Sequence, residues 1–406
     1  MAQGSTGRPL PGRARAPTMH AAGGPTAPLV IYARSVLSGN VLAEVSVLPE
    51  DSLTHLRQSV ARALALAGPL RLLLGERVLS GPGSVAHAGL HDGAVLDVVR
   101  GSQVVGTAST DGTAKLWCAK TGTCLQTLRG HRDQVMSVEF SPDGLLVATA
   151  STDRTAMVWC SDSGLCLLRL EGHAGPVYSA VFSPDCQYVA TSSQDRTAKV
   201  WRLRDGACEQ TLRGHARQVH SVAFSPDNQL LATASDDLTV KVWSTSSLQL
   251  RAEAVGHTES VYSVGFSPDS KRMVTASLDC SAKVWNADTG KCSMTLTGHD
   301  AWLRAAAFSP DGQQVVTVSG DATAKLWDTS DGVCARTLTG HSDWVRSAAF
   351  SPDGQLVATA SKDTTARLWS VESGCCVQFL EGHGGWVRSV AFMPHGTLQG
   401  PCLAPH

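Results

Sequence analysis

Long apolar runs are missing from this chain. No stretch approaches the roughly 18 consecutive apolar residues that a membrane-spanning helix needs. An excess of charge of one sign is missing too, since 34 Lys and Arg residues oppose 35 Asp and Glu residues for a formal net charge of −1. Such a chain has no overall field that would hold a polyanion. We therefore expect no membrane partner and consider nucleic acid a poor partner.

The placement of the cysteines argues against a disulfide or zinc framework. The chain has 12 cysteines but no Cys-x-x-Cys pair, no His/Cys cluster with zinc-ligand spacing and no Asn-x-Ser/Thr sequon. Six cysteines recur at one repeat position, which Leu250 occupies in a further copy, and we predict a small apolar packing position there. These six are Cys124, Cys166, Cys208, Cys292, Cys334 and Cys376. The pattern favours an intracellular protein with reduced thiols, cytoplasmic or alternatively nuclear.

Sequence motifs of common enzymes are lacking as well. The chain contains no P-loop, no Gly-x-Ser-x-Gly and no His-Glu-x-x-His. Ser, His and Asp do recur together, which invites comparison with a catalytic triad. An active site is normally single, however, and a buried His satisfied by Asp and Ser is inert. We predict that the protein is not an enzyme and has no catalytic residue. We also expect it to bind no cofactor, no metal ion and no small-molecule substrate.

Neither end of the chain shows a sequence pattern typical of a helix or a strand. Residues 1–28 hold Arg8, Arg13 and Arg15 but no acidic residue, and they lack the apolar core of a secretory signal. We expect a disordered tail there, with an organelle transit peptide as the alternative. Residues 397–406 have no strand pattern, and we expect them to be unstructured.

What the chain does have is a strict repeat of 42 residues. Gly-His pairs end at His131, His173, His215, His257, His299, His341 and His383. Tryptophans fall at Trp117, Trp159, Trp201, Trp243, Trp285, Trp327 and Trp369. Aspartates fall at Asp111, Asp153, Asp195, Asp237, Asp279, Asp321 and Asp363. No insertion or deletion interrupts these series.

Each repeat predicts four short antiparallel strands. In one copy "VRSAAF" (345–350) precedes an SPDG turn, and "QLVATAS", "TARLW" and a strand near "CCVQFL" follow. Four such strands make one blade of a β-propeller. The Gly-His pair, SPDG, Ser-x-Asp and the Trp position resemble the WD40 family over about residues 103–396, although Trp-Asp itself survives only at Trp327-Asp328. The resemblance implies a seven-bladed WD40 propeller at residues 102–396.

The strand count predicts how the ring closes. The array opens at residue 103 with the second, third and fourth strands of a blade, and it ends with a first strand, "WVRSVAF" (386–392). We predict that the C-terminal strand pairs beside residues 103–109, which removes both open sheet edges. The expected fold class is mainly β, a propeller closed by its C-terminal strand and preceded by a small α+β domain.

Residues 29–101 follow a different pattern. "LVIYARSV" and "VLAEVSVL" flank a Ser-Gly-Asn turn and predict a hairpin, which an amphipathic stretch from Leu53 to Leu66 follows. The order β-β-α-β-β resembles the β-grasp fold of ubiquitin, so we expect a ubiquitin-like domain. The chain continues through Arg100-Gly101-Ser102 into the repeats, and its first 114 residues contain no lysine. This predicts a fixed docking or spacer domain.

The WD40 resemblance implies that the recurring Ser, His, Asp and Trp form a structural tetrad, which ties the outer strands of a blade to its Gly-His loop. The second blade would use His131, Ser151, Asp153 and Trp159. The blade that joins the chain ends would use His383, Ser109, Asp111 and Trp117.

The same resemblance implies that partners contact the top face, at the third and fifth residues after the Gly-His histidine and at the residue before the turn Asp. Three successive blades carry Trp302/Arg304/Gly320, Trp344/Arg346/Lys362 and Trp386/Arg388/Thr110. The other four carry Gln134/Met136/Thr152, Pro176/Tyr178/Gln194, Gln218/His220/Asp236 and Ser260/Tyr262/Leu278.

Aromatic and Arg residues dominate the hot spots of interfaces. We therefore predict a partner-binding surface made of Trp302, Arg304, Trp344, Arg346, Lys362, Trp386, Arg388, Tyr178, His220 and Tyr262. Its arginines would suit an acidic or phosphorylated peptide. The alternative is that the three Trp-x-Arg copies record recent duplication.

These features favour a non-catalytic scaffold or adaptor whose partners are other proteins. One alternative is a substrate receptor or adaptor in the ubiquitin–proteasome pathway, although no ligase-docking segment is visible. Another is a WD-repeat assembly factor for axonemal dynein, which the "TAKLW"-type strands resemble weakly.

Overall fold

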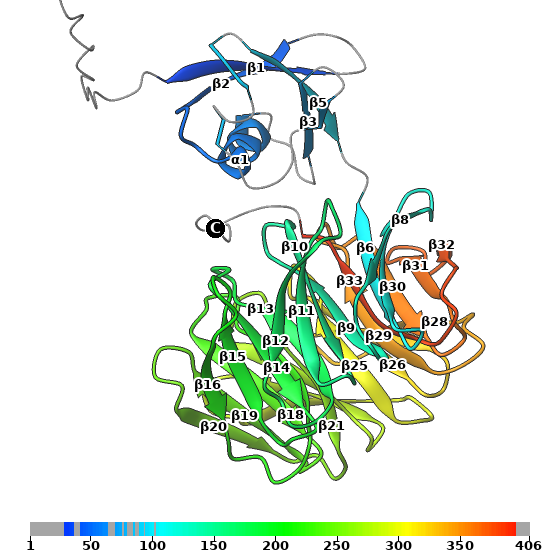
Figure 1. The fold of residues 1–406 in the computed structure, drawn as a ribbon. Coiled ribbons are helices and arrows are strands. Elements are labelled where there is room, and N and C mark those ends of the chain that lie inside the picture. The colour runs from blue at the N-terminus through cyan, green and yellow to red at the C-terminus, as the bar shows by residue number, and fades with distance from the viewer. Residues whose placement is uncertain are drawn as a thin grey trace, which may run out of the picture.

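The computed structural model describes residues 28–35, 41–63, 70–74, 77–78, 84–85, 89–92, 94–100 and 103–394. The tails expected at residues 1–28 and 397–406 lie outside these ranges, apart from residue 28. The described residues form one mixed sheet with a helix near the N-terminus and seven four-stranded sheets after it (Figure 1).

The N-terminal module consists of β1 (Leu29–Ser35), β2 (Val41–Val47), α1 (Leu53–Ala63), β3 (Leu70–Leu74), β4 (Arg77–Val78) and β5 (Val95–Arg100). The sheet order is β2-β1-β5-β3-β4, with β1 antiparallel to β2 and parallel to β5. At the start of α1, the Ser52 hydroxyl accepts the backbone N–H of His55 at 3.1 Å, as an N-cap does. Fully buried Ile31, Leu56 and Leu96 lie in its core. No helix in the described ranges is long and apolar enough to cross a membrane.

The seven repeats form seven antiparallel sheets, one per blade. The first blade combines β33 (Val387–Phe392), β6 (Val104–Ser109), β7 (Thr113–Cys118) and β8 (Cys124–Arg129). The second contains β9 (Val135–Phe140), β10 (Leu146–Ser151), β11 (Thr155–Cys160) and β12 (Cys166–Glu171). The third contains β13 (Val177–Phe182), β14 (Tyr188–Ser193), β15 (Ala198–Arg202) and β16 (Cys208–Leu212). The fourth contains β17 (Val219–Phe224), β18 (Leu230–Ser235), β19 (Thr239–Ser244) and β20 (Leu250–Val255).

The remaining blades repeat this arrangement. The fifth contains β21 (Val261–Phe266), β22 (Arg272–Ser277), β23 (Ser281–Asn286) and β24 (Cys292–Thr297). The sixth contains β25 (Leu303–Phe308), β26 (Gln314–Ser319), β27 (Ala324–Asp328) and β28 (Cys334–Leu338). The seventh contains β29 (Val345–Phe350), β30 (Leu356–Ser361), β31 (Ala366–Ser370) and β32 (Cys376–Leu380).

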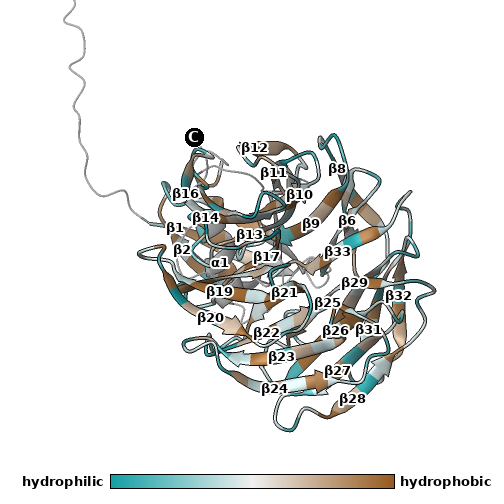
Figure 2. Ribbon diagram, turned by 90° about the horizontal axis from the view of Figure 1, so that it is seen from below, coloured by the Kyte–Doolittle hydropathy of each residue, from teal (hydrophilic) through white to brown (hydrophobic). Residues whose placement is uncertain are grey.

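The first strand of every blade lies on the inside of the ring and the fourth on the outside (Figure 2). Each inner strand neighbours the inner strands of the two adjacent blades, including β33 beside both β29 and β9. Second strands such as β10 are buried along their whole length, because neighbouring blades cover both of their faces. Fourth strands such as β12 are mostly exposed. The hydrophobic core is therefore divided among the interfaces between blades.

The C-terminal strand closes the ring, as the strand count predicts. β33 pairs antiparallel with β6, with Val387 opposite Ser109 and Phe392 opposite Val105. Serine hydroxyls join it to both neighbours: Val390 N–H reaches the Ser347 hydroxyl at 3.3 Å, and the Ser389 hydroxyl accepts Val138 N–H at 3.4 Å. The two ends of the repeat array thus share one sheet.

The prediction of an apolar packing position is wrong for four of the six repeat cysteines, whereas Cys334 and Cys376 pack in part against hydrophobic clusters. All six are free thiols; Cys124, Cys166, Cys208 and Cys292 are exposed, and Cys334 and Cys376 are half-buried. The reason is that this residue begins the fourth strand of its blade, at the outer edge of the sheet. The thiols bond to nearby backbone there, as Cys292 Sγ does to the Met294 carbonyl at 3.4 Å.

Candidate functional site

A buried chain of polar side chains holds the top face of each blade in place. In the first blade, Trp117 Nε1–H donates to the Thr107 hydroxyl at 2.7 Å, and this hydroxyl lies 2.7 Å from His383 Nε2. On its other side, His383 Nδ1 contacts Asp111 at 2.8 Å. Asp111 also accepts the backbone N–H of Gly384 at 3.0 Å. A neutral His that donates from Nδ1 and accepts at Nε2 satisfies every group in this chain.

Threonine, and not the expected serine, joins the His to the Trp. In the second blade the Thr149 hydroxyl lies 2.8 Å from both His131 Nε2 and Trp159 Nε1. Ser151 bonds elsewhere, because it sits at the strand end, where its hydroxyl accepts Asp153 N–H at 3.1 Å. Ser109 likewise accepts Asp111 N–H at 3.1 Å. The tetrads predicted with Ser109 and Ser151 are corrected accordingly. The His, Asp and Trp members lie where they were placed.

Ionisation in these tetrads follows from their burial. Burial alone would raise the pKa of Asp111, but hydrogen bonds from Thr113 and His383 and the attraction of His383 outweigh it and lower the pKa to about 2. Burial lowers the pKa of His383 below its usual 6.5, against the opposing effect of Asp111. The His–Asp hydrogen bond recurs in the other six blades, which fits a structural role.

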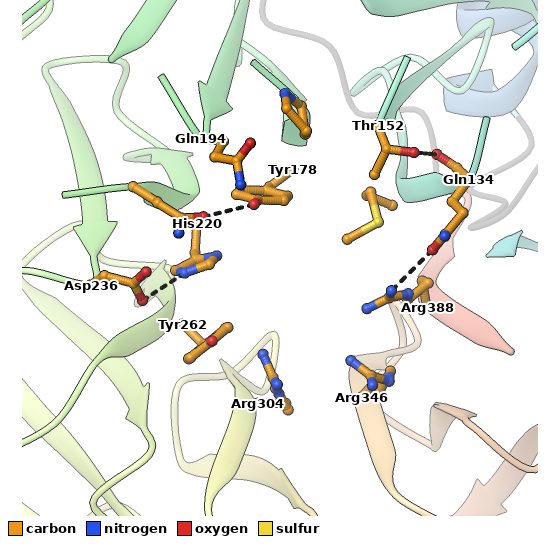
Figure 3. A pocket seen from close by; sticks show the side chains of 13 residues that line it. Gln134, Thr152, Tyr178, Gln194, His220, Asp236, Tyr262, Arg304, Arg346 and Arg388 are labelled. Atoms are coloured by element: carbon orange, nitrogen blue, oxygen red, sulfur yellow. Dashed lines mark hydrogen bonds and ion pairs between the residues drawn. The ribbon is translucent and has the colours of Figure 1, made fainter. Parts of the chain in front are cut away.

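A pocket of about 570 Å³ opens on the face that carries the Gly-His loops, and all seven blades line it (Figure 3). We call it the axial pocket. Its lining is Gln134, Met136, Thr152, Pro176, Tyr178, Gln194, Gln218, His220, Asp236, Tyr262, Arg304, Arg346 and Arg388. Every one of these residues occupies one of the three repeat positions at which the WD40 resemblance implies partner contacts.

One side of the axial pocket is basic. Arg304, Arg346 and Arg388 come from three adjacent blades and point toward the pocket (Figure 3). No described carboxylate lies within ion-pair distance of these guanidiniums, and the buried Nε of each has no hydrogen-bond partner among the described residues. Burial, followed by repulsion from Arg388 and Arg304, lowers the pKa of Arg346 to about 9. The three charges are thus concentrated, no described ion pair compensates them, and Asp343 offsets only part of the effect on Arg346.

Aromatic rings hold these guanidiniums in place. The Arg304 guanidinium lies 3.9 Å from the ring centroid of Tyr262 and 4.8 Å from that of Trp302. Arg346 lies between Trp344 and Trp386, at 5.5 and 5.3 Å from their centroids. Stacking of this kind orients a guanidinium without using its hydrogen-bond donors.

The opposite side of the pocket is aromatic and polar. His220 stacks on Tyr262 with ring centroids 4.1 Å apart and on Tyr178 at 5.0 Å. His220 Nε2 also contacts Asp236 at 2.7 Å, and Tyr178 donates to the Gln218 side chain at 2.7 Å. The partner-binding surface predicted from the sequence includes the three rings of this wall but not Asp236 or Gln218. The sequence shows the repeat positions of both residues. It does not show that Asp236 pairs with His220 of the same blade, or that Gln218 pairs with Tyr178 of the preceding blade.

The rim beside the arginines is built from tryptophans. Trp302 and Trp344 meet edge to face with centroids 4.7 Å apart. Lys362 Nζ lies 4.2 Å from the centroid of Trp344 and 4.9 Å from that of Trp386, and it pairs with Asp343 at 3.4 Å. Trp386 is 38% exposed and is the tryptophan most open to a partner. We refer to these three tryptophans, the three arginines and Lys362 as the Trp–Arg arc.

The uncompensated arginines should cost stability. We expect Arg346→Met to raise the unfolding free energy at pH 7 by about 1–2 kcal/mol. Partial exposure keeps the gain well below what the full pKa shift implies. Urea unfolding measures the difference. Arg251→Met, at an exposed pair with Asp288, is the control and should change little. A clear loss of stability in Arg346→Met would contradict the assignment.

The chain belongs to the WD40 repeat family. The family's sequence pattern, described as WD domain, G-beta repeat, matches residues 122–160, 164–202, 206–244, 249–286, 290–328, 332–370 and 374–403, which together cover more than half of the chain. Proteins with these repeats are generally scaffolds that bind other proteins, and they are typically not enzymes. A comparison with curated proteins returned no match.

Proposed function

We propose that this protein is a non-catalytic scaffold or adaptor, and that the top face of its propeller binds a partner protein or peptide. The observation that carries the proposal is the Trp–Arg arc beside the axial pocket. Trp and Arg are the residues most enriched in interface hot spots. Here they are concentrated on three adjacent blades, where the arginines line the pocket and pair with no described carboxylate.

The charge of the arc indicates which kind of partner fits. Three arginines face the axial pocket, and Lys362 adds a cation at the rim. An acidic segment would pair with these cations, while its apolar side chains would pack on the tryptophans. The closed ring supports this role, because a rigid platform loses little conformational freedom when a partner binds.

We also propose that residues 29–101 are a ubiquitin-like domain that positions or engages a second partner. The sheet order β2-β1-β5-β3-β4, with β1 parallel to β5 and α1 packed against the sheet, supports this proposal. Two apolar side chains of the module, Leu48 and Val95, are 39% and 40% exposed. They are the described residues of the module that best suit a contact.

Affinity purification with the full chain tests the main proposal. We expect Trp386→Ala combined with Lys362→Glu to lower partner recovery by about tenfold or more, as loss of a hot spot does. The matched control combines Gln355→Ala with Lys271→Glu, at exposed turns that follow the first strands of their blades. Equal recovery with the arc variant and the wild type would rule out the arc as the binding surface.

A third variant addresses the N-terminal module. Leu48→Glu places a charge on its exposed apolar surface and leaves the propeller unchanged. Selective loss of one set of partners would support a two-partner adaptor. Loss of proteasome subunits in particular would favour a receptor in the ubiquitin–proteasome pathway. An unchanged set would show that this surface binds none of them.

A further inference from the structure

We infer that the axial pocket binds a phosphate dianion carried on a phosphorylated side chain of the partner, so that phosphorylation of the partner controls binding. This inference rests on the proposed function and specifies its ligand. Arg304, Arg346 and Arg388 form the phosphate site, and the remaining pocket accommodates the segment that carries the phosphate.

The three guanidiniums have unmet hydrogen-bonding capacity. The Nε atoms of Arg304, Arg346 and Arg388 are buried without a partner among the described residues. Arg388 donates from a terminal nitrogen to the Gln134 side chain at 3.1 Å, which fixes its orientation and leaves Nε free. A buried Nε cannot reach a ligand in the pocket, so the donors open to one are the terminal nitrogens, and among the described residues only Arg388 has a partner there. A tetrahedral phosphate offers enough oxygens to accept from all three guanidiniums.

Charge balance favours a dianion over a carboxylate. Repulsion among the three guanidiniums contributes to the lowered pKa of Arg346 and Arg388, after the larger effect of burial. The nearest acidic groups are already engaged, since Asp236 pairs with His220 and Asp343 with Lys362. A carboxylate would neutralise one of three charges, whereas a phosphate monoester near pH 7 carries close to two.

The site is also arranged before the ligand arrives. Arg304 is held between Tyr262 and Trp302, and Arg346 between Trp344 and Trp386. Because these cation–π contacts hold both guanidiniums, little side-chain freedom remains to be lost on binding. Asp236 lies on the opposite wall of the pocket (Figure 3). A second phosphate there would be repelled, so the pocket selects a single phosphorylated residue.

Thermal unfolding of the full chain in the presence of defined anions tests this directly. The probes are O-phospho-L-serine, inorganic phosphate, myo-inositol hexakisphosphate, L-glutamate and sodium sulfate. A ligand that binds only the folded protein raises its Tm with concentration. We expect phosphoserine to raise the Tm, with half-saturation at a concentration at least about tenfold lower than glutamate requires. Tryptophan fluorescence should change over the same range, because three tryptophans contact the arginines.

Two triple variants separate the site from general electrostatics. We expect Arg304→Gln/Arg346→Gln/Arg388→Gln to abolish the phosphoserine response. The control, Arg132→Gln/Arg154→Gln/Arg196→Gln, removes the same charge at exposed positions of the same face and should respond like the wild type. Arg346→Met alone is a second site variant in case the triple variant unfolds, and it should weaken half-saturation by about tenfold.

The outcomes also separate this inference from the proposed function. Equal responses to phosphoserine, glutamate and sulfate would overturn the phosphate site, and so would a wild-type protein that responds to none of the anions. Tight binding of inositol hexakisphosphate without any response to phosphoserine would overturn the phosphorylated-partner assignment. In each case the rim variant Trp386→Ala/Lys362→Glu still decides independently whether the top face binds a protein.

Discussion

Replacing Val387 by Asp is expected to unfold the propeller or to leave it only marginally stable. Val387 is fully buried in the strand that closes the ring, in a cluster with Val105 and Trp117 of the first blade and Leu368 of the seventh. The substitution loses the burial of an apolar side chain and places an unpaired carboxylate in that cluster. Each effect costs several kcal/mol, against a total stability of about 5–15 kcal/mol.

The expected loss concerns more than one residue, because β33 holds three blades together. It pairs with β6 and bonds through serine hydroxyls to β29 and β9. Without it, the first blade loses its innermost strand and exposes sheet edges. We therefore expect the whole ring to unfold cooperatively. Urea titrations would show a smaller unfolding transition with a lower midpoint, and the native circular dichroism spectrum would be lost.

Val377→Asp is the matched control. It makes the same substitution one strand earlier in the chain, at a position on β32 that is 52% exposed. We expect it to change the unfolding free energy by less than about 0.5 kcal/mol. If Val387→Asp unfolded no more readily than Val377→Asp, the closing strand would not stabilise the ring.

Much of the propeller is accessible from the sequence because its signals are redundant. The Gly-His, Asp and Trp series recur in register, so an uncertain strand in one copy can be read from another. The same register shows that the array begins with a second strand and ends with a first one. Ring closure between β33 and β6 follows from that count alone, and the observed pairing confirms it.

The tetrads show where the repeat misleads. A Thr at the position of Thr149 and a Ser at the position of Ser151 both recur in every repeat. The two residues are two positions apart and lie on the same face of β10. Sequence spacing cannot determine which hydroxyl the Trp159 indole reaches. That depends on the pairing of β10 with β11, in which Trp159 lies opposite Val147 and reaches diagonally to Thr149. The prediction for the repeat cysteines fails for a related reason. A repeat position that accepts Cys or Leu can lie at the outer edge of a sheet as well as in the hydrophobic core.

The axial pocket can be predicted from the sequence only in part. Its lining positions can be selected from the sequence, because the fold assigns each repeat position to a place on the ring. The chemistry of the pocket cannot be predicted in this way, because it depends on contacts between blades. Tyr262 of the fifth blade contacts Arg304 of the sixth and stacks on His220 of the fourth. Contacts across blades depend on side-chain orientations that a 42-residue period does not encode.

Acid is expected to destabilise the propeller strongly, beginning just below pH 6.5. Burial lowers the pKa of His257, His299 and His383 below the usual 6.5, so between the folded and the unfolded pKa these rings bind fewer protons in the folded protein than in the unfolded chain. The unfolded state then binds more protons, and the unfolding free energy falls as the pH falls. Each ring contributes up to about 1.4 kcal/mol per pH unit, so three contribute up to about 4 kcal/mol per unit.

The aspartates extend this loss to lower pH with the same sign. Hydrogen bonds and the paired His outweigh burial and lower the pKa of Asp111 to about 2, from an ordinary value of 3.8. An aspartate whose pKa is lowered by folding stabilises the protein above its unfolded pKa, and this contribution disappears as the pH falls toward the folded value. Urea titrations at pH 7.5, 6.5, 5.5 and 4.5 should therefore show a midpoint that declines continuously.

A single tetrad variant tests the cause. Glutamine at position 257 can still donate to Asp279 and accept from Thr275, which His257 contacts at 2.7 Å each, but it does not titrate. His257→Gln should lose stability at pH 7.5 and show a shallower decline below pH 6.5, by up to about 1.4 kcal/mol per pH unit. An unchanged slope would mean that the buried ring takes up its proton within the fold. The tetrads would then be ion pairs, and acid would strengthen the His–Asp contact until the aspartates themselves protonate.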